Sequence, residues 1–177
     1  TVHNMIGEQV LPVRHTTPES TDLQKLLRDM VMEGVHSCVM EVSSHALALN
    51  RVDGCEFDVA IYTNLTQDHL DFHTDMKDYL DSKLKLFSRL AAPGKRGKKY
   101  AIINEDDIYA QHFKEAAGGA VYTYGLKGPA DVMAKDINIS SRGVKFNVAG
   151  RRGCCSINLK IPGIFNLYNS LAAFTAS

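Results

Sequence analysis

The chain has 177 residues, of which 45% are hydrophobic and 23% charged, an ordinary composition for a globular domain. Its twenty Lys and Arg balance its twenty Asp and Glu, so the charge gives no reason to expect nucleic acid or an anionic membrane as a partner. No apolar run approaches the roughly 20 residues of a transmembrane helix, and no signal peptide is visible.

Strands and helices are expected to alternate along most of the chain. In chain order the sequence predicts two short strands within 2–13, a loop at 16–20, a helix at 21–33, a strand at 38–42, a turn or short helix from 43, a strand at 57–62, a helix at 75–90, a strand at 99–104, a helix at 106–117 and a strand at 120–124. Strands that alternate with helices are typical of a parallel sheet with helical crossovers, so the predicted fold class is α/β.

After Gly128 the pattern changes to the two-residue period of half-buried strands. Val144, Phe146 and Val148 alternate with polar residues, which predicts a small antiparallel sheet within 131–161. We therefore expect a mostly parallel sheet flanked by helices, with a small antiparallel sheet near the C-terminal end.

The ends of the chain and its cysteines indicate its context. The chain begins with Thr1 rather than Met and ends inside a helical pattern at 169–177, so we expect a fragment of a longer protein. No cysteine pair has CxxC spacing, which argues against a zinc site or a disulfide framework. We expect four reduced thiols and a cytoplasmic protein. The cysteines are Cys38, Cys55, Cys154 and Cys155.

Two polar clusters follow apolar runs, and ligands bind at the carboxyl ends of strands in open α/β sheets. Glu41 interrupts the run at 38–42, either as a ligand or as a hydrogen-bonded residue at a strand end. The stretch TNLTQDHLDFH at 63–73 carries His69 and His73. A metal role is the favoured interpretation of this cluster. The alternative is a helix start capped by one of its aspartates, Asp68 or Asp71.

The donor types favour magnesium over zinc. Zinc needs three or four His, Cys or carboxylate ligands at close range, and the thiols lie elsewhere in the sequence. A carboxylate such as Glu41 with waters, and one imidazole in addition, suits Mg²⁺ better. Magnesium in turn points to phosphate chemistry.

Lys83 is the third unusual residue. The helix at 75–90 has an apolar stripe, and Lys83 falls inside it, four residues from both Tyr79 and Phe87. Such a lysine either extends its amine to solvent or pairs with an acid, or it is a desolvated amine with a lowered pKa. A neutral amine could take up carbon dioxide as a carbamate, which would convert a cation into an anionic magnesium ligand.

A phosphate-binding loop of the form GxxxxGK[ST] is absent from the 177 residues. The segment 94–99 (GKRGKK) has the wrong spacing and is a better match to a solvated turn. We therefore expect that this chain alone does not hydrolyse ATP or form an amide bond.

Five motifs, in this order, resemble those of the Mur ligases, and most closely the MurE-type ligases. The motifs are TTPES (16–20), EVSSHAL (41–47), TNLTQDHLDFH (63–73), YLDSKLKLF (79–87) and GIFNLYNSLAA (163–173). The resemblance covers nearly the whole chain and implies that residues 1–177 are an incomplete central domain with a mononucleotide-binding α/β fold.

The resemblance also implies residue roles. Glu41 and His69 match magnesium ligands, and Lys83 matches a carbamylated lysine that acts in catalysis and metal binding. Contacts to the UDP-MurNAc-dipeptide substrate are implied for four residues, and proximity to the adenine for two asparagines that could otherwise be caps of the last helix. These residues are Thr16, Thr17, Ser43 and Arg51 for the substrate, and Asn166 and Asn169 for the nucleotide.

The implied reaction is ATP-dependent amide formation in peptidoglycan synthesis. ATP phosphorylates the D-glutamyl γ-carboxylate of UDP-MurNAc-L-Ala-D-Glu, and the amino group of a diamino acid attacks the acyl phosphate. Phosphoryl transfer depends on positioning and on charge neutralisation by Mg²⁺. The protein is expected to be monomeric. The sequence does not distinguish meso-diaminopimelate from L-lysine, and it leaves the roles of His45 and His73 open.

The chain departs from the family pattern in several ways. The ATP loop, the N-terminal uridine-binding domain and the C-terminal domain are missing, and Leu49 replaces a polar substrate contact of some members. Two other functions stay open, namely a metal-dependent hydrolase with a carbamylated lysine and a non-catalytic nucleotide-binding module. Tightly bound zinc would favour the first, and alanine substitutions at Glu41 and Lys83 without effect would favour the second.

Overall fold

A computed structural model describes residues 3–13, 15–66, 72–91, 97–150 and 153–177. The chain forms two compact units. The first unit comprises Thr1–Cys55 and His69–Lys85, and the second unit comprises Glu56–Asp68 and Leu86–Ser177. No helix among the described residues is long and apolar enough to cross a membrane.

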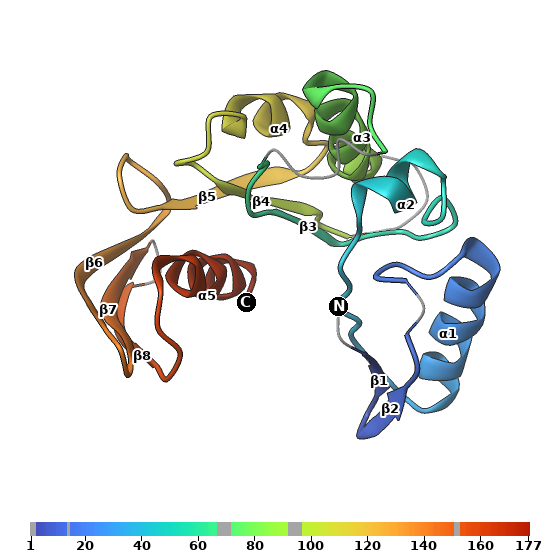
Figure 1. Ribbon diagram of the computed structural model, residues 1–177, viewed down its shortest axis with the longest axis horizontal. Coiled ribbons are helices and arrows are strands. Elements are labelled where there is room, and N and C mark those ends of the chain that lie inside the picture. The colour runs from blue at the N-terminus through green and yellow to red at the C-terminus, as the bar shows by residue number, and fades with distance from the viewer. Residues whose placement is uncertain (1–2, 14, 67–71, 92–96, 151–152) are drawn as a thin grey trace. The chain divides into compact units, whose positions relative to one another are not determined.

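The second unit is built on one six-stranded sheet in the order β3-β4-β5-β6-β7-β8 (Figure 1). Neighbours from β3 to β6 are parallel, and β6, β7 and β8 form an antiparallel meander. The predicted α/β fold is confirmed, although the antiparallel part continues the parallel sheet and is not a separate one. The strands are β3 (Val59–Tyr62), β4 (Tyr100–Asn104), β5 (Ala120–Gly125), β6 (Val132–Ser140), β7 (Gly143–Gly150) and β8 (Gly153–Leu159).

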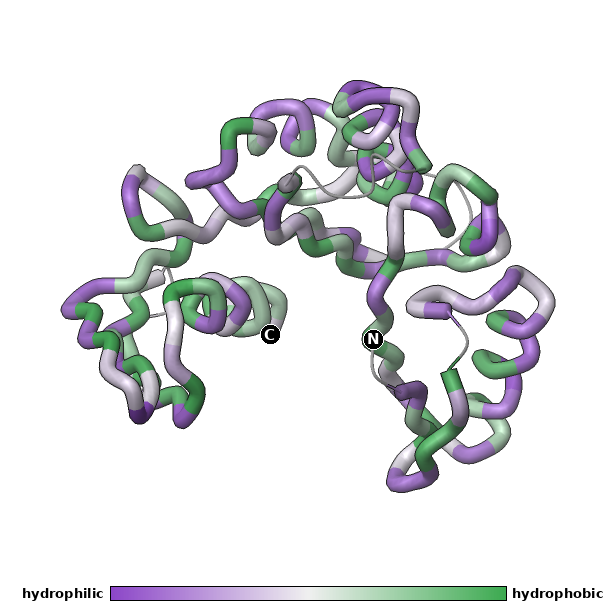
Figure 2. Tube along the Cα trace, viewed as in Figure 1, coloured by the Kyte–Doolittle hydropathy of each residue, from purple (hydrophilic) through white to green (hydrophobic). Residues whose placement is uncertain are grey.

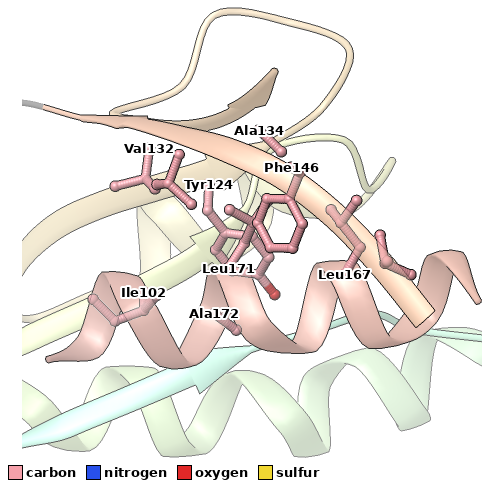
Figure 3. Close-up of a cluster of buried hydrophobic side chains, with 10 residues drawn as sticks. Ile102, Tyr124, Val132, Ala134, Phe146, Leu167, Leu171 and Ala172 are labelled. Atoms are coloured by element: carbon pink, nitrogen blue, oxygen red, sulfur yellow. The ribbon is translucent and has the colours of Figure 1, made fainter. Parts of the chain in front are cut away.

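One face of this sheet is covered by α5 (Ile164–Ala176). Its buried Leu167 and Leu171 are one helical turn apart and pack against sheet residues such as Phe146 (Figure 3). The predicted alternation along β7 is confirmed, because Val144, Phe146 and Val148 are all buried.

The other face carries α4 (Ala110–Ala116) (Figure 1). An aromatic cluster joins this helix to the sheet and to α3 (Met76–Ser88). The ring of Tyr62 stacks on Phe113 at 3.7 Å between centroids, and Phe87 meets Phe113 edge-on at 4.9 Å. Phe87 belongs to α3, which continues as a short 3-10 turn, η1 (Arg89–Ala91). Aromatic packing of this kind stabilises a core beyond simple area burial.

The first unit contains the two predicted N-terminal strands, the helices α1 and α2, and most of α3. Strands β1 (Asn4–Ile6) and β2 (Gln9–Leu11) pair antiparallel around Gly7. Helix α1 (Ser20–Met32) ends before Gly34, whose φ of 74° suits the residue after a helix. Hydrophobic and hydrophilic segments alternate along α1, as expected of an amphipathic helix (Figure 2). Helix α2 (Ser44–Ala48) confirms the predicted short helix.

Two predicted elements differ from the structure. Residues 38–42 form no strand, because the described residues supply no neighbouring strand to pair with them, and Val39 is 96% exposed. Helix α4 begins at Ala110 instead of residue 106. The Asn104 and Asp107 side chains accept the backbone N–H groups of Asp106 and Tyr109, which stabilises turns in place of the first helical turn.

Candidate functional site

Glu41 and Lys83 come together within the first unit. Lys83 lies on α3, half-buried beside the buried residues Tyr79 and Ser82. Its Nζ is 5.3 Å from the centroid of the Tyr79 ring. The predicted stripe is therefore confirmed, and Lys83 is placed in it.

The surroundings of Lys83 favour a neutral amine. Burial lowers the pKa of the Lys83 amine, and the carboxylate of Glu41 raises it by a smaller amount, so the pKa lies below its ordinary value. The amine therefore spends more time unprotonated than a surface lysine does. An unprotonated amine is a nucleophile that can attack carbon dioxide.

Thr17 fixes the backbone on both sides of Val42. Its hydroxyl donates to the carbonyl of Glu41 at 2.9 Å and accepts the N–H of Ser43 at 3.1 Å. Thr17 is 1% exposed, so these bonds form away from water. The position of the Glu41 backbone thus depends on one buried hydroxyl.

Arg51 and Ser43 extend this hydrogen-bonded group. The Nη1 of Arg51 donates to the carbonyl of Thr17 at 3.2 Å, and its Nη2 pairs with Glu19 at 2.6 Å. The Ser43 hydroxyl accepts the N–H of Ala46 and so caps α2. Three predicted substrate residues (Thr17, Ser43 and Arg51) therefore form one cluster, and Thr16 adjoins it in the sequence.

His73 and His45, whose roles the sequence leaves open, belong to an aromatic cluster in the same unit. His73 is 2% exposed, stacks on Tyr79 at 5.1 Å between centroids and lies edge-on to His45 at 5.8 Å. Its Nδ1 is 3.1 Å from the carboxylate of Asp78. The same carboxylate accepts the N–H of Thr74 at the start of α3. His73 thus supports the helix that carries Lys83.

The predicted metal ligand His69, with Asp68 and Asp71, lies outside the described residues. Among the residues that the structure does describe, no group of three or more His, Cys, Asp or Glu could hold a metal ion. The Glu41 carboxylate, which is close enough to Lys83 to affect the pKa of its amine, is an oxygen donor of the kind that magnesium prefers.

Asn166 and Asn169 lie on α5 in the second unit. The Asn166 side chain donates to the carbonyl of Pro162 at 2.7 Å and so holds the turn before the helix. The N-cap itself is Gly163, with φ of 106°. Asn169 is exposed three residues further along, on the same side of the helix as Asn166.

Sequence reasoning missed the polar residues at the carboxyl end of β4. The Nδ2 of Asn104 donates to the carbonyl of Thr63 at 2.7 Å, and Asp107 accepts the hydroxyl of Tyr62 at 2.7 Å. The signal was present as the run NEDD at 104–107, directly after a buried strand. Polar residues at the carboxyl end of a parallel strand are candidates for ligand binding or for support of a site.

A pocket of the second unit contains none of the predicted site residues. It is lined by apolar residues of the sheet and by the end of α5, including Val59, Ile102, Val132 and Phe174. Cys154 and Cys155 also line it, and neither of them forms a disulfide. Its lining offers few groups for phosphate chemistry.

Comparison with known proteins gives matches along the whole chain. The family described as "Mur ligase middle domain" matches residues 1–177. The UDP-N-acetylmuramoyl-L-alanyl-D-glutamate–2,6-diaminopimelate ligase of Caldanaerobacter subterraneus subsp. tengcongensis is 54% identical over 177 residues, which is 100% of this chain and 35% of the relative. The enzyme of the same name from Bacillus velezensis is 46% identical over 174 residues, 98% of this chain and 36% of the relative.

A solved structure agrees with these matches. A UDP-N-acetylmuramoyl-L-alanyl-D-glutamate–2,6-diaminopimelate ligase superposes with a TM-score of 0.82 and 32% identity, over 95% of this chain and 35% of that protein. The chain thus spans about a third of the length of the curated relatives it matches.

Proposed function

Because this chain belongs to the Mur ligase family, whose middle domain it matches from end to end, we propose that it is the ATP-using middle domain of an amide-forming ligase of peptidoglycan synthesis. The substrates are ATP, UDP-MurNAc-L-Ala-D-Glu and a diamino acid. The relatives that it matches are named as 2,6-diaminopimelate ligases, which supports diaminopimelate over lysine. We further propose a monomeric, cytoplasmic protein in which residues 1–177 are part of a longer chain.

The observation that best supports this proposal is the environment of Lys83. In the proposed modification, the Nζ lone pair attacks the carbon of CO₂, an N–C bond forms, and one C=O electron pair moves onto oxygen. The amine then loses a proton to water, which leaves an anionic carbamate. The half-buried amine near Glu41, with its lowered pKa, supports this step.

Glu41, His69 and the Lys83 carbamate would hold Mg²⁺. The bound ion supplies neutralisation of the charge that develops on the transferred phosphoryl group. Glu41 is anchored for this task through Thr17, which bonds its backbone carbonyl. Tyr79 packs against Lys83 and limits where its side chain can lie, and His73 stacks on Tyr79.

The other predicted residues would bind the substrate and the nucleotide. Thr16, Thr17, Ser43 and Arg51 are proposed to bind the UDP-MurNAc-dipeptide, and the Nε of Arg51 is buried with no partner among the described residues, which supports a donor role. Asn166 and Asn169, which share one side of α5, are proposed to lie beside the adenine.

The test uses the full-length protein that contains this chain. With ATP, Mg²⁺ and UDP-MurNAc-L-Ala-D-Glu, we expect amide formation with diaminopimelate at a much higher kcat/KM than with L-lysine, measured by release of ADP and mass spectrometry of the product. Tightly bound zinc with hydrolysis of an amide would instead support the hydrolase alternative.

The isolated 177-residue chain serves as the companion sample. We expect it to form no amide and release no ADP, because its sequence contains no glycine-rich phosphate loop. ATP-dependent amide formation by this chain alone would contradict that expectation.

A further inference from the structure

Asp106, in the turn after β4, binds donors from two different parts of the second unit. One oxygen, Oδ2, accepts the N–H of Leu126 at 2.6 Å and the hydroxyl of Tyr168 at 2.8 Å. The other, Oδ1, accepts the N–H of Lys127 at 3.1 Å. One carboxylate therefore connects the loop after β5 to helix α5.

These bonds favour the charged form of the carboxylate. Burial raises the pKa of Asp106, but the donors from Leu126, Tyr168 and Lys127 lower it by more, so the pKa lies below its ordinary value. An added Cβ at Gly125 would lie 3.0 Å from Oδ1 of Asp106, so the loop passes close to the carboxylate. Hydrogen bonds to a charged group are stronger than neutral ones.

The neighbouring Asp107 binds a different part of the same unit. It accepts the hydroxyl of Tyr62 at 2.7 Å and the N–H of Leu65 at 3.4 Å, both at the end of β3. Asp106 and Asp107 thus hold the loops on opposite sides of β4, and Asp106 also bonds the side chain of Tyr168 on α5.

Tyr168 lies between the two proposed nucleotide-binding residues. Asn166 precedes it by two positions and Asn169 follows it directly. Leu167 and Leu171 anchor the buried face of α5, and the Tyr168 hydroxyl adds a bond from the helix to the carboxyl end of the sheet. This end of a parallel sheet is where ligands bind.

We propose that Asp106 and Tyr168 are positioning residues for the nucleotide. Through their hydrogen bond they fix the N-terminal half of α5, and with it the two asparagines, relative to the ends of β4 and β5. The inference rests on the proposed function, since it concerns the ATP site of the same ligase.

The test is steady-state kinetics of the full-length ligase with Tyr168→Phe, which removes only the hydroxyl. We expect the KM for ATP to rise about 5- to 10-fold, with the KM for UDP-MurNAc-dipeptide changed less than about twofold. Asp106→Asn leaves one acceptor oxygen for three donors and should also raise the KM for ATP, and the rise in the double variant should be smaller than the product of the two single rises, because both changes act on the same bond.

The matched control is Tyr124→Phe. It removes a different tyrosine hydroxyl of the second unit, one that donates to the carbonyl of Tyr62 at 3.0 Å instead of to the Asp106 carboxylate. An equal rise in the KM for ATP in both tyrosine variants, or equal rises in both KM values for Tyr168→Phe, would overturn the inference while leaving the ligase function intact. A wild-type protein without ligase activity would overturn the proposed function itself. If Asp106→Asn fails to fold, comparing the KM for ATP of Tyr168→Phe with that of Tyr124→Phe still tests the inference.

Discussion

Replacing Lys83 with alanine in the full-length protein is expected to remove most of the ligase activity. The substitution deletes the amine that would form the carbamate, and with it one anionic ligand of Mg²⁺. Loss of a preorganised charge contact to a phosphoryl-transfer transition state reduces kcat by about 100- to 1,000-fold. We therefore expect a loss of at least that size in kcat.

Stability should change little in the same variant. Because the folded state lowers the pKa of Lys83, the charged amine disfavours folding at neutral pH, and this penalty diminishes as the pH rises from the lowered pKa toward about 10.4, the value in an unfolded chain. Alanine removes the penalty but also the contact with Tyr79. We expect the free energy of unfolding to change by less than about 1 kcal/mol.

The assay compares ADP release with and without added bicarbonate and short carboxylic acids. Lys83→Ala should regain part of its activity with a short carboxylate, which can occupy the place of the carbamate, and ¹³C NMR with labelled bicarbonate should show a carbamate signal only in the wild type. Lys77→Ala is the control, since Lys77 is exposed on the same helix and pairs only with exposed Asp81 among the contacts described. Full activity of Lys83→Ala without any additive would refute the reasoning.

Two further predictions concern residues that support the site. Thr17→Val should lower the free energy of unfolding by about 1–3 kcal/mol and raise the Mg²⁺ concentration needed for activity, because the carbonyl of Glu41 and the N–H of Ser43 lose their buried partner. Chemical denaturation and a Mg²⁺ titration of the activity measure these two effects, with Thr21→Val, at an exposed position, as the control. The charged Asp106 stabilises the fold at pH values above the ordinary carboxyl pKa of about 3.9, and this stabilisation is lost as the pH falls through the lower pKa of Asp106 in the folded state. Between pH 6 and pH 3, the Tm of Asp106→Asn should therefore fall less than the Tm of the wild type. An equal loss in both proteins would contradict this.

Periodicity predicted the elements whose formation depends on local pattern. The apolar stripe of α3 predicted that Lys83 is partly buried, and alternation predicted the buried face of β7. These features follow from side-chain spacing on one helix or strand, which is visible in the sequence. The proximity of Glu41 to Lys83 was suggested only by the family motifs.

Features that depend on distant partners could not be predicted. Residues 38–42 have the composition of a strand, but a strand needs a neighbour, and the described residues supply none. The start of α4 was placed too early because side-chain bonds of Asn104 and Asp107 stabilise turns instead. The bond between Asp106 and Tyr168 joins positions far apart in the sequence, and no local pattern indicates such a pairing.

The mixed sheet of the second unit has a consequence for the order of folding. In the antiparallel part, Gly150 pairs with Gly153, only three positions further along the chain, whereas Val59 in the parallel part pairs with Tyr100 only after a helix and a long crossover. Closing a short loop loses less chain entropy than closing a long one, and local pairings form faster. We therefore expect the meander of β6, β7 and β8 to gain protection from hydrogen exchange first, and β3 to join the sheet last.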